Sequence, residues 1–131
     1  MSWVDIEKAL RAPFKVNQLY WRGGVDGPYT VRLNVHHVVN RLDCVMGIEN
    51  WQDRYEEVSG RLICYLSLRS DGEWITKSDG ILERNSGGFK TDISDAFMRA
   101  AKKFGVGRYL HYLPKDASPT NIPRWAVPDL L

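Results

Sequence analysis

The chain has 131 residues, of which 44% are hydrophobic and 26% are charged. This length suffices for one domain with a hydrophobic core and is too short for two domains of ordinary size. The formal net charge of +2 does not by itself indicate a nucleic-acid-binding protein. No segment is apolar over the length needed to span a membrane, and the first residues carry no signal-peptide pattern. We therefore expect no membrane anchor and no leader.

The N-terminal region predicts a short helix over residues 2–10. Ser2 can cap this helix, because its hydroxyl can accept a hydrogen bond from a free N–H of the first turn. Pro13 ends it. Residues 14–21 are expected to be extended or irregular, because they show no clear periodicity.

A strand followed by a helix is predicted next. Residues 29–33 are typical of a short strand. Asn34 can cap a helix over residues 35–46, in which the apolar residues recur at helical spacing. Gly47 is expected to end this helix, because glycine tolerates the left-handed conformation found after many helices.

Residues 51–81 predict three successive antiparallel strands. We expect them over residues 51–58, 61–69 and 73–81, and Asp71-Gly72 between the last two is a strong hairpin signal. The middle strand alternates apolar and mixed positions, as in a sheet with helices on one side. Its apolar positions are Leu62, Cys64, Leu66 and Leu68.

A basic amphipathic helix over residues 91–104 follows this sheet in the sequence. Thr91 or Asp92 is expected to cap its start and Gly105 to end it. Its C-terminal part and the exit, from Arg99 to Leu110, carry four basic residues and no acidic one. Such a helix can pack on a sheet with its apolar side and hold an anion with its basic side, although a merely solvated charged face shows the same pattern.

The last segment has a different composition, because four of the six prolines lie between residues 114 and 128. Proline lacks an N–H group, so we expect neither helix nor regular sheet pairing here. Two alternatives stay open. The tail wraps over its own domain or a neighbouring subunit with Trp125 as an anchor, or it is frayed.

Several kinds of catalytic or cofactor site are absent from the sequence. It contains no GxxxxGK[ST] phosphate loop, no complete dinucleotide fingerprint and no HExxH. The two cysteines, Cys44 and Cys64, have no metal-site spacing and are expected to be free, buried thiols in a reducing cytoplasm. We therefore expect no enzymatic activity, no cofactor and no metal. Four charged residues of the sheet resemble a metal-dependent nuclease site but are also typical of hairpin tips and edges: Asp71, Glu73, Lys77 and Asp79.

Four stretches together form a more specific pattern. They are residues 51–55 (WQDRY), 72–80 (GEWITKSDG), 94–101 (SDAFMRAA) and 104–110 (FGVGRYL). In combination they resemble the single-strand annealing proteins of the Rad fifty-two superfamily, and most of all its DdrA-like branch in bacteria and phages. The resemblance covers roughly residues 6–114.

The resemblance implies an α+β fold, in which an antiparallel sheet of three to four strands packs on the central basic helix. It also implies a homo-oligomeric ring that binds single-stranded DNA and anneals complementary strands without ATP, in homologous recombination and double-strand break repair. Residues 1–113 would form the annealing and oligomerisation domain, and residues 114–131 a proline-rich tail. A recombinase or a single-strand-binding protein is a further expected partner, in the cytoplasm at the nucleoid or in a phage-infected cell.

Family members hold the DNA backbone with basic side chains from the helix and from before the first strand. Arg99 and Lys102 match the helix positions, and Arg22 matches the other. Met98 stands where relatives usually have a lysine, which removes one phosphate contact. The full expected set also includes five further cations: Lys90, Lys103, Arg108, Lys77 and Arg32.

Three alternative interpretations stay open. A double-stranded RNA-binding module also combines three strands with a basic helix, but such modules are shorter and lack the preceding strand and helix. The nuclease interpretation would require a metal site at the sheet carboxylates. Tyr65 can stack on bases or pack within the sheet.

Overall fold

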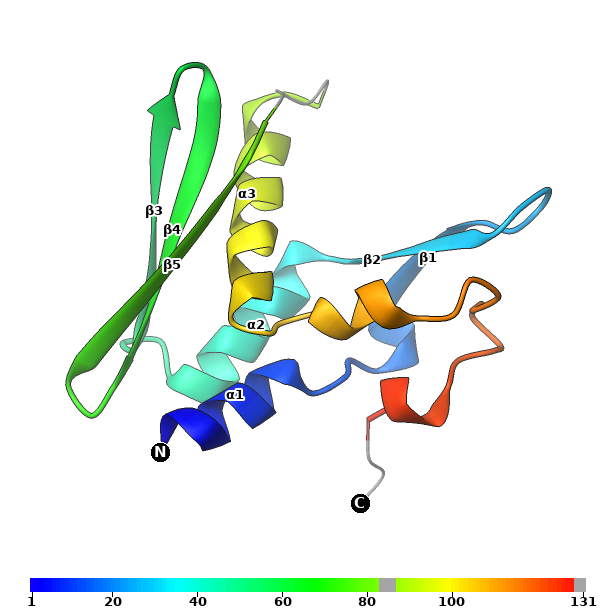
Figure 1. The fold of residues 1–131 in the computed structure, drawn as a ribbon, viewed down its shortest axis with the longest axis horizontal. Coiled ribbons are helices and arrows are strands. Elements are labelled where there is room, and N and C mark those ends of the chain that lie inside the picture. Colours follow the sequence, from blue (N-terminus) through cyan, green and yellow to red (C-terminus); the bar gives the residue numbers. More distant parts are fainter. Residues whose placement is uncertain (83–86, 129–131) are drawn as a thin grey trace.

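The computed structural model describes residues 1–82 and 87–128, which form an α+β fold (Figure 1). The fold class expected from the sequence is confirmed. The main elements are α1 (Trp3–Arg11), β1 (Leu19–Gly23), β2 (Tyr29–Leu33), α2 (Val35–Met46), β3 (Trp51–Val58), β4 (Arg61–Ser70), β5 (Glu73–Ile81) and α3 (Phe89–Lys103). Short 3-10 helices lie at Val16–Gln18 (η1), Arg108–Tyr112 (η2) and Arg124–Ala126 (η3).

The main sheet has the order β3–β4–β5, with both pairs antiparallel. Asp71 and Gly72 both have positive φ, 52° and 78°, which is the conformation of a two-residue hairpin turn. The predicted hairpin is therefore confirmed. The apolar alternation of β4 is also confirmed, because its four inward residues are buried: Leu62, Cys64, Leu66 and Leu68.

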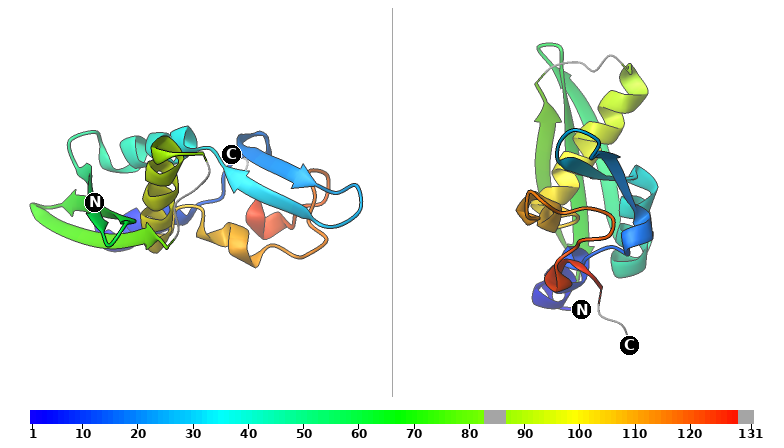
Figure 2. Two further views of the ribbon diagram at one scale, coloured as in Figure 1. Left: turned by 90° about the horizontal axis from the view of Figure 1, so that it is seen from above. Right: turned by 90° about the vertical axis from the view of Figure 1, so that its right-hand side faces the viewer.

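All three helices lie on one face of this sheet (Figure 2). α3 packs against β4 and β5, α2 contacts β3, β4 and α3, and α1 packs on α2. The Phe97 ring of α3 lies 6.0 Å from the Trp51 ring of β3, measured between centroids. Among the described residues, no helix or strand covers the opposite face, which we call the open face of the sheet.

The first strands are arranged differently from the expectation. β1 and β2 pair with each other as a separate antiparallel hairpin and do not join the main sheet. The sequence does not reveal β1, because its alternation spans only five residues, with Leu19 and Trp21 half-buried on one side and Tyr20 and Arg22 exposed on the other. The main sheet lies on one side of α3, and the hairpin extends away from α3 on the opposite side (Figures 1 and 2).

The start of α3 also differs from the expectation, whereas its end agrees. The helix begins at Phe89 after Gly88 as N-cap, and no side chain caps it. Asp92 therefore lies inside the helix and is fully buried. The sequence Asn85-Ser86-Gly87-Gly88 also predicts a loop before this helix, and its first two residues lie outside the described residues. At the other end, Gly105 has a φ of 103°. Its N–H donates to the Lys102 carbonyl at 2.9 Å, as in a glycine-terminated helix.

The proline-rich tail folds back beside the hairpin (Figure 1). Ala117 and Ala126 are buried, whereas Trp125 is 53% exposed and so is only partly covered by its own domain. An anchoring role of Trp125 on a neighbouring subunit stays a prediction.

The short helix η3 forms against the expectation, whereas the isolated bridge between Ser118 and Asn121 agrees with the expected lack of regular sheet pairing. The prolines do not block η3, because its N–H donors are Ala126 and Val127 and Pro123 only accepts through its carbonyl.

Two smaller expectations concern the thiols and the membrane. Cys64 is buried as predicted, but Cys44 is exposed, because it lies on the outer side of α2. Within residues 1–82 and 87–128, none of the helices has the length and apolar composition needed to cross a bilayer.

Candidate nucleic-acid interface

Basic side chains donate hydrogen bonds to the last backbone carbonyls of α3. Arg108 donates from Nε to the Lys102 carbonyl at 3.0 Å and from Nη2 to the Lys103 carbonyl at 2.8 Å. Lys77 Nζ of β5 donates to the same Lys103 carbonyl at 3.2 Å. The last carbonyls of a helix lack partners within the helix and carry a partial negative charge, so cations stabilise them. These contacts give Lys77 and Arg108 a structural role.

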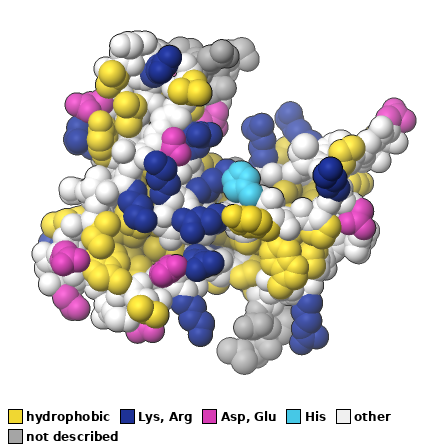
Figure 3. All heavy atoms as spheres, viewed as in Figure 1, with side chains coloured by type: hydrophobic (Ala, Val, Ile, Leu, Met, Phe, Trp, Pro, Cys, Tyr) yellow, Lys and Arg dark blue, Asp and Glu magenta, His cyan; other side chains and the backbone are white. Residues whose placement is uncertain are grey.

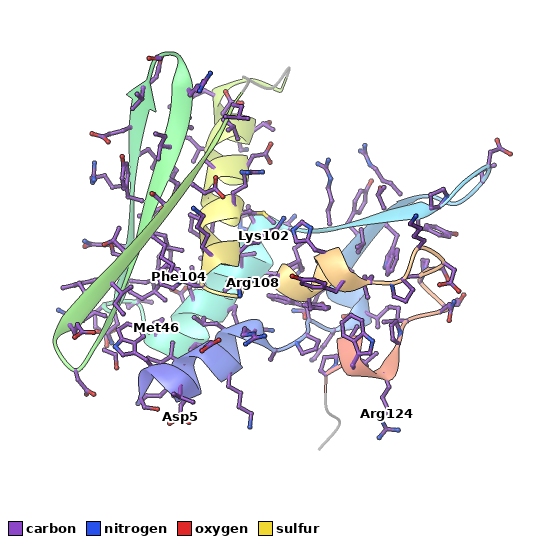
Figure 4. The ribbon with its side chains drawn as sticks, in the orientation of Figure 1. Asp5, Met46, Lys102, Phe104, Arg108 and Arg124 are labelled. Carbon is purple, nitrogen blue, oxygen red and sulfur yellow. The ribbon has the colours of Figure 1, made fainter. Side chains whose placement is uncertain are left out.

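Lys103 is engaged in a similar way. Its Nζ donates to the Ser78 carbonyl of β5 at 2.6 Å, which ties the end of α3 to the sheet. Lys77 also lies over the Phe104 ring, 5.3 Å from its centroid. Figure 4 shows Lys102, Phe104 and Arg108 at this end of the helix. Lys77, Lys103 and Arg108 therefore contribute positive charge, while part of their donor capacity is used within the protein.

Two neighbouring hollows bring cations together, one between β5, the end of α3 and η2, and the other between α3 and the hairpin. One is bordered by Arg99, Lys102 and His111 together with Lys103 and Arg108. The other shares the first three of these and adds Arg32 from β2. Figure 3 shows Lys and Arg side chains gathered on this face with a histidine beside them. We name this surface the basic corner, formed by Arg32, Arg99, Lys102, Lys103, Arg108 and His111.

The basic corner concentrates like charges on partly buried groups. Burial lowers the pKa of Lys102, and the positive charges of Arg99 and Arg32 lower it further. The charge of Lys102 lowers the pKa of His111, with smaller effects from burial and from Arg99. A like charge nearby and a low-dielectric surrounding both disfavour the protonated form of these groups. A bound anion would relieve this repulsion, so the corner is suited to an external phosphate.

Two carboxylates border the basic corner, Asp79 in one hollow and Asp95 in the other. Both raise the pKa of Lys102, against the lowering by burial and by the arginines. Asp79 Oδ1 is 3.3 Å from Arg99 Nε and also accepts the Gly80 N–H at 2.7 Å. The Arg99 side chain is still 55% exposed, whereas that of Asp79 is 25% exposed. The ion pair therefore offsets part of the charge of Arg99 while leaving its guanidinium accessible to a ligand.

The remaining expected residues lie at different distances from the corner. Arg22 lies on β1, on the same exposed side of the hairpin as Arg32. Lys90 is exposed in the first turn of α3, twelve residues before Lys102, or about 18 Å along the helix axis. The structure brings Arg32 to the centre of the site, although the sequence makes it only a secondary candidate. DNA contact by Lys90, as by every other residue of the expected set, stays a prediction.

Two residues change the site expected from the sequence. His111 has no signal in the sequence, because it lies in the short helix η2, where no periodicity marks a functional face. Met98, which departs from the expected lysine, is half-buried, packs against the core and borders the hollow that contains Arg32. Its apolar side chain lines this hollow at the position where relatives usually have a lysine.

The suspected nuclease set overlaps with the basic corner at Asp79. Tyr65 lies on the open face, with the Arg54 guanidinium 4.2 Å from its ring centroid. This contact agrees with packing on the sheet surface, and base stacking by Tyr65 stays an alternative. Among the residues that the structure describes, no three His, Cys, Asp or Glu side chains are close enough to hold a metal ion together. Asp79, one of the suspected nuclease carboxylates, is paired with Arg99 instead.

Comparison with known proteins identifies relatives along nearly the whole chain. The chain is 31% identical to the single-stranded DNA-binding protein DdrA of Deinococcus deserti, and the match covers 98% of the chain and 73% of the relative. It is 29% identical to the protein of the same name from Deinococcus radiodurans, over 98% of the chain and 71% of the relative. No protein-family model matches the chain. Both names describe binding proteins and not enzymes.

Proposed function

Because the chain belongs to the family of the single-stranded DNA-binding protein DdrA, we propose that it binds single-stranded DNA through the basic corner. The observation that carries this proposal is the convergence of Arg32, Arg99 and Lys102 on connected hollows. Burial lowers the pKa of Lys102, the charges of Arg99 and Arg32 lower it further, and a phosphate backbone is the natural counter-charge. As in its family, the chain acts by binding and not by catalysis.

Binding of this kind depends on salt and is nearly independent of sequence. Each cation that neutralises a phosphate releases counterions, so affinity falls as the salt concentration rises. Contacts to the backbone leave the base edges free to pair. This arrangement is what an annealing protein requires, because the bound strand must still recognise its complement.

We extend the proposal to annealing of complementary strands by a homo-oligomeric ring within the Rad fifty-two superfamily, in recombination and repair. β3 and β5 are the edge strands of the main sheet, and exposed strand edges are readily paired or covered by a neighbouring subunit. A recombinase or a single-strand-binding protein is the further partner, and the cytoplasm at the bacterial nucleoid or in a phage-infected cell is the setting that this role implies.

The experiment is a fluorescence annealing assay with two complementary oligonucleotides, without ATP or metal, beside light scattering for mass. Faster annealing by a particle many times the 15.1 kDa chain would support the ring annealer. A monomer that binds the strand but leaves annealing at its spontaneous rate would reduce the function to binding alone. Duplex RNA as competitor, and a labelled strand with magnesium, separate the RNA-binding and nuclease alternatives.

A further inference from the structure

The exposed side of the hairpin combines one aromatic ring with two arginines. In the register of β1 and β2, Tyr20 lies opposite Arg32, and Arg22 lies opposite Thr30. Alternate residues of a strand point to the same side, and directly paired residues share a side. Tyr20, Arg22 and Arg32 therefore lie on one side of the hairpin, and all three are exposed.

The Tyr20 ring is accessible and held by a neighbour. Tyr20 is 56% exposed, and the Arg22 guanidinium lies over its ring, 5.5 Å from the centroid. The other aromatic rings of the hairpin are engaged differently, because Trp21 and Tyr29 contact each other edge-to-face at 5.9 Å. Tyr20 is thus the hairpin ring that shares its side with the two arginines.

The surroundings of Tyr20 are continuous with the basic corner. Tyr20, Arg32 and Leu33 border one hollow beside the start of α2. Arg32 and Leu33 also border the hollow that contains Arg99 and Lys102. A strand whose phosphates lie at Lys102 therefore has a direct surface path, past Arg32, to the Tyr20 ring.

We propose that Tyr20 is a stacking platform for an unpaired nucleobase of the strand bound in the basic corner. This inference rests on the proposed function and deepens it, because it supplies a reason for preferring single strands. An aromatic ring can stack on the face of any base. In a duplex the base faces are already stacked on their neighbours, so only a single strand can offer one at no cost in pairing.

The test compares two oligonucleotides of equal length, one of deoxythymidine and one abasic, which has the same phosphates and no bases. Their affinities are measured by fluorescence anisotropy for the wild type, Tyr20→Ala and Tyr20→Phe. The wild type should prefer the deoxythymidine strand. Tyr20→Ala should lower affinity for that strand by roughly 5- to 150-fold, with the abasic affinity and the salt slope unchanged. Tyr20→Phe keeps the ring and should behave as the wild type.

The outcomes separate this inference from the function on which it rests. Equal affinity of the wild type for both strands, or an equal loss of both affinities in Tyr20→Ala at unchanged melting temperature, would overturn the stacking role and leave backbone binding intact. Failure of the wild type to bind either strand would overturn the proposed function itself. A Tyr20→Ala chain that melts early would be replaced by Tyr20→Leu, which keeps apolar bulk and should show the same selective loss.

Discussion

The basic corner and the open face of the sheet both carry arginines, but they use them in opposite ways. On the open face, Arg54 lies over the Tyr65 ring at 4.2 Å and 3.6 Å from Glu56. Arg69 lies over the Trp74 ring at 4.9 Å and donates from Nε to the Asn50 side chain at 2.9 Å. Both of these guanidinium groups have aromatic and polar partners of their own.

In the basic corner, the cations face one another instead. Lys102 is half-buried beside Arg99 and Arg32, and its pKa is lowered by burial first and then by their charges. Asp95 and Asp79 act in the opposite direction but offset only part of this effect, because the pKa of Lys102 stays lowered. The difference between the two regions shows that the number of basic residues does not mark a phosphate site. A phosphate site is indicated instead by cations that lie close together and whose charge the protein's own groups compensate only in part.

The largest expected effect comes from removing two cations of the corner together. The slope of log affinity against log salt concentration is negative, and Arg99→Ala with Lys102→Ala should make it shallower by about 1.4. Each cation that neutralises a phosphate of a single strand contributes about 0.7 to its magnitude. At 0.1 M salt this corresponds to roughly 25-fold weaker binding. Anisotropy titrations of a labelled deoxythymidine strand at several salt concentrations measure both quantities.

The matched control removes two cations from the open face. Arg54→Ala with Arg69→Ala deletes the same net charge from the chain but breaks interactions that are internal to the sheet. Its salt slope should stay at the wild-type value. Equal decreases of affinity in the two double variants would show that overall charge, and not the corner, governs binding.

A smaller and opposite effect is expected when one carboxylate of the corner is neutralised. Asp79→Asn removes the negative charge beside Arg99 and should tighten binding of the single strand by about two- to fivefold, the range of an exposed ion pair. Glu56→Gln is the control, because it neutralises the partner of Arg54 on the open face. Weaker binding by Asp79→Asn would mean that the carboxylate positions Arg99 instead of competing with the phosphate.

The smallest expected effect is a pH dependence through His111. Its pKa is lowered by the charge of Lys102, by burial and by Arg99, so it is neutral at pH 7 and gains a proton only below its ordinary range. The folded state disfavours that proton, so a small contribution to stability is lost as pH falls through the folded pKa. A bound DNA strand favours the protonated form of His111, because the phosphates attract its positive charge. DNA binding should therefore tighten as pH is lowered from about 7.5 towards about 5.5.

The variant His111→Gln tests this dependence in the same titration. It removes the titrating group and keeps a polar side chain, so its affinity should change less with pH than that of the wild type. Equal pH profiles for the two proteins would assign the dependence to another group.

Local signals in the sequence predicted most of the fold. Asn34 caps the start of α2 and Gly47 its end, as expected, and Asp71-Gly72 forms the predicted turn. These signals are readable in the sequence because a cap or a turn depends on only a few neighbouring residues. The sequence could not place β1, whose pairing with β2 spans a loop. It also could not predict that α3 starts at Phe89, because no side chain caps it.

The candidate site was predictable only in part for the same reason. Arg99 and Lys102 stand three apart on one helix, so helical spacing alone places them on neighbouring positions of its surface. Arg32 and His111 reach them from β2 and η2, and only the tertiary fold creates that proximity. The engagement of Lys103 and Arg108 by backbone carbonyls was equally invisible in a pattern of charges.

The central claim, that the single strand lies in the basic corner, is tested most directly by lysine footprinting. The wild-type chain is acetylated with and without a deoxythymidine strand, and the modification of each lysine is measured by mass spectrometry. We predict that the strand strongly protects Lys102, whose lowered pKa makes the free amine more reactive, and leaves the exposed Lys8 of α1 unchanged. Full modification of Lys102 in the presence of a saturating, bound strand would contradict the claim.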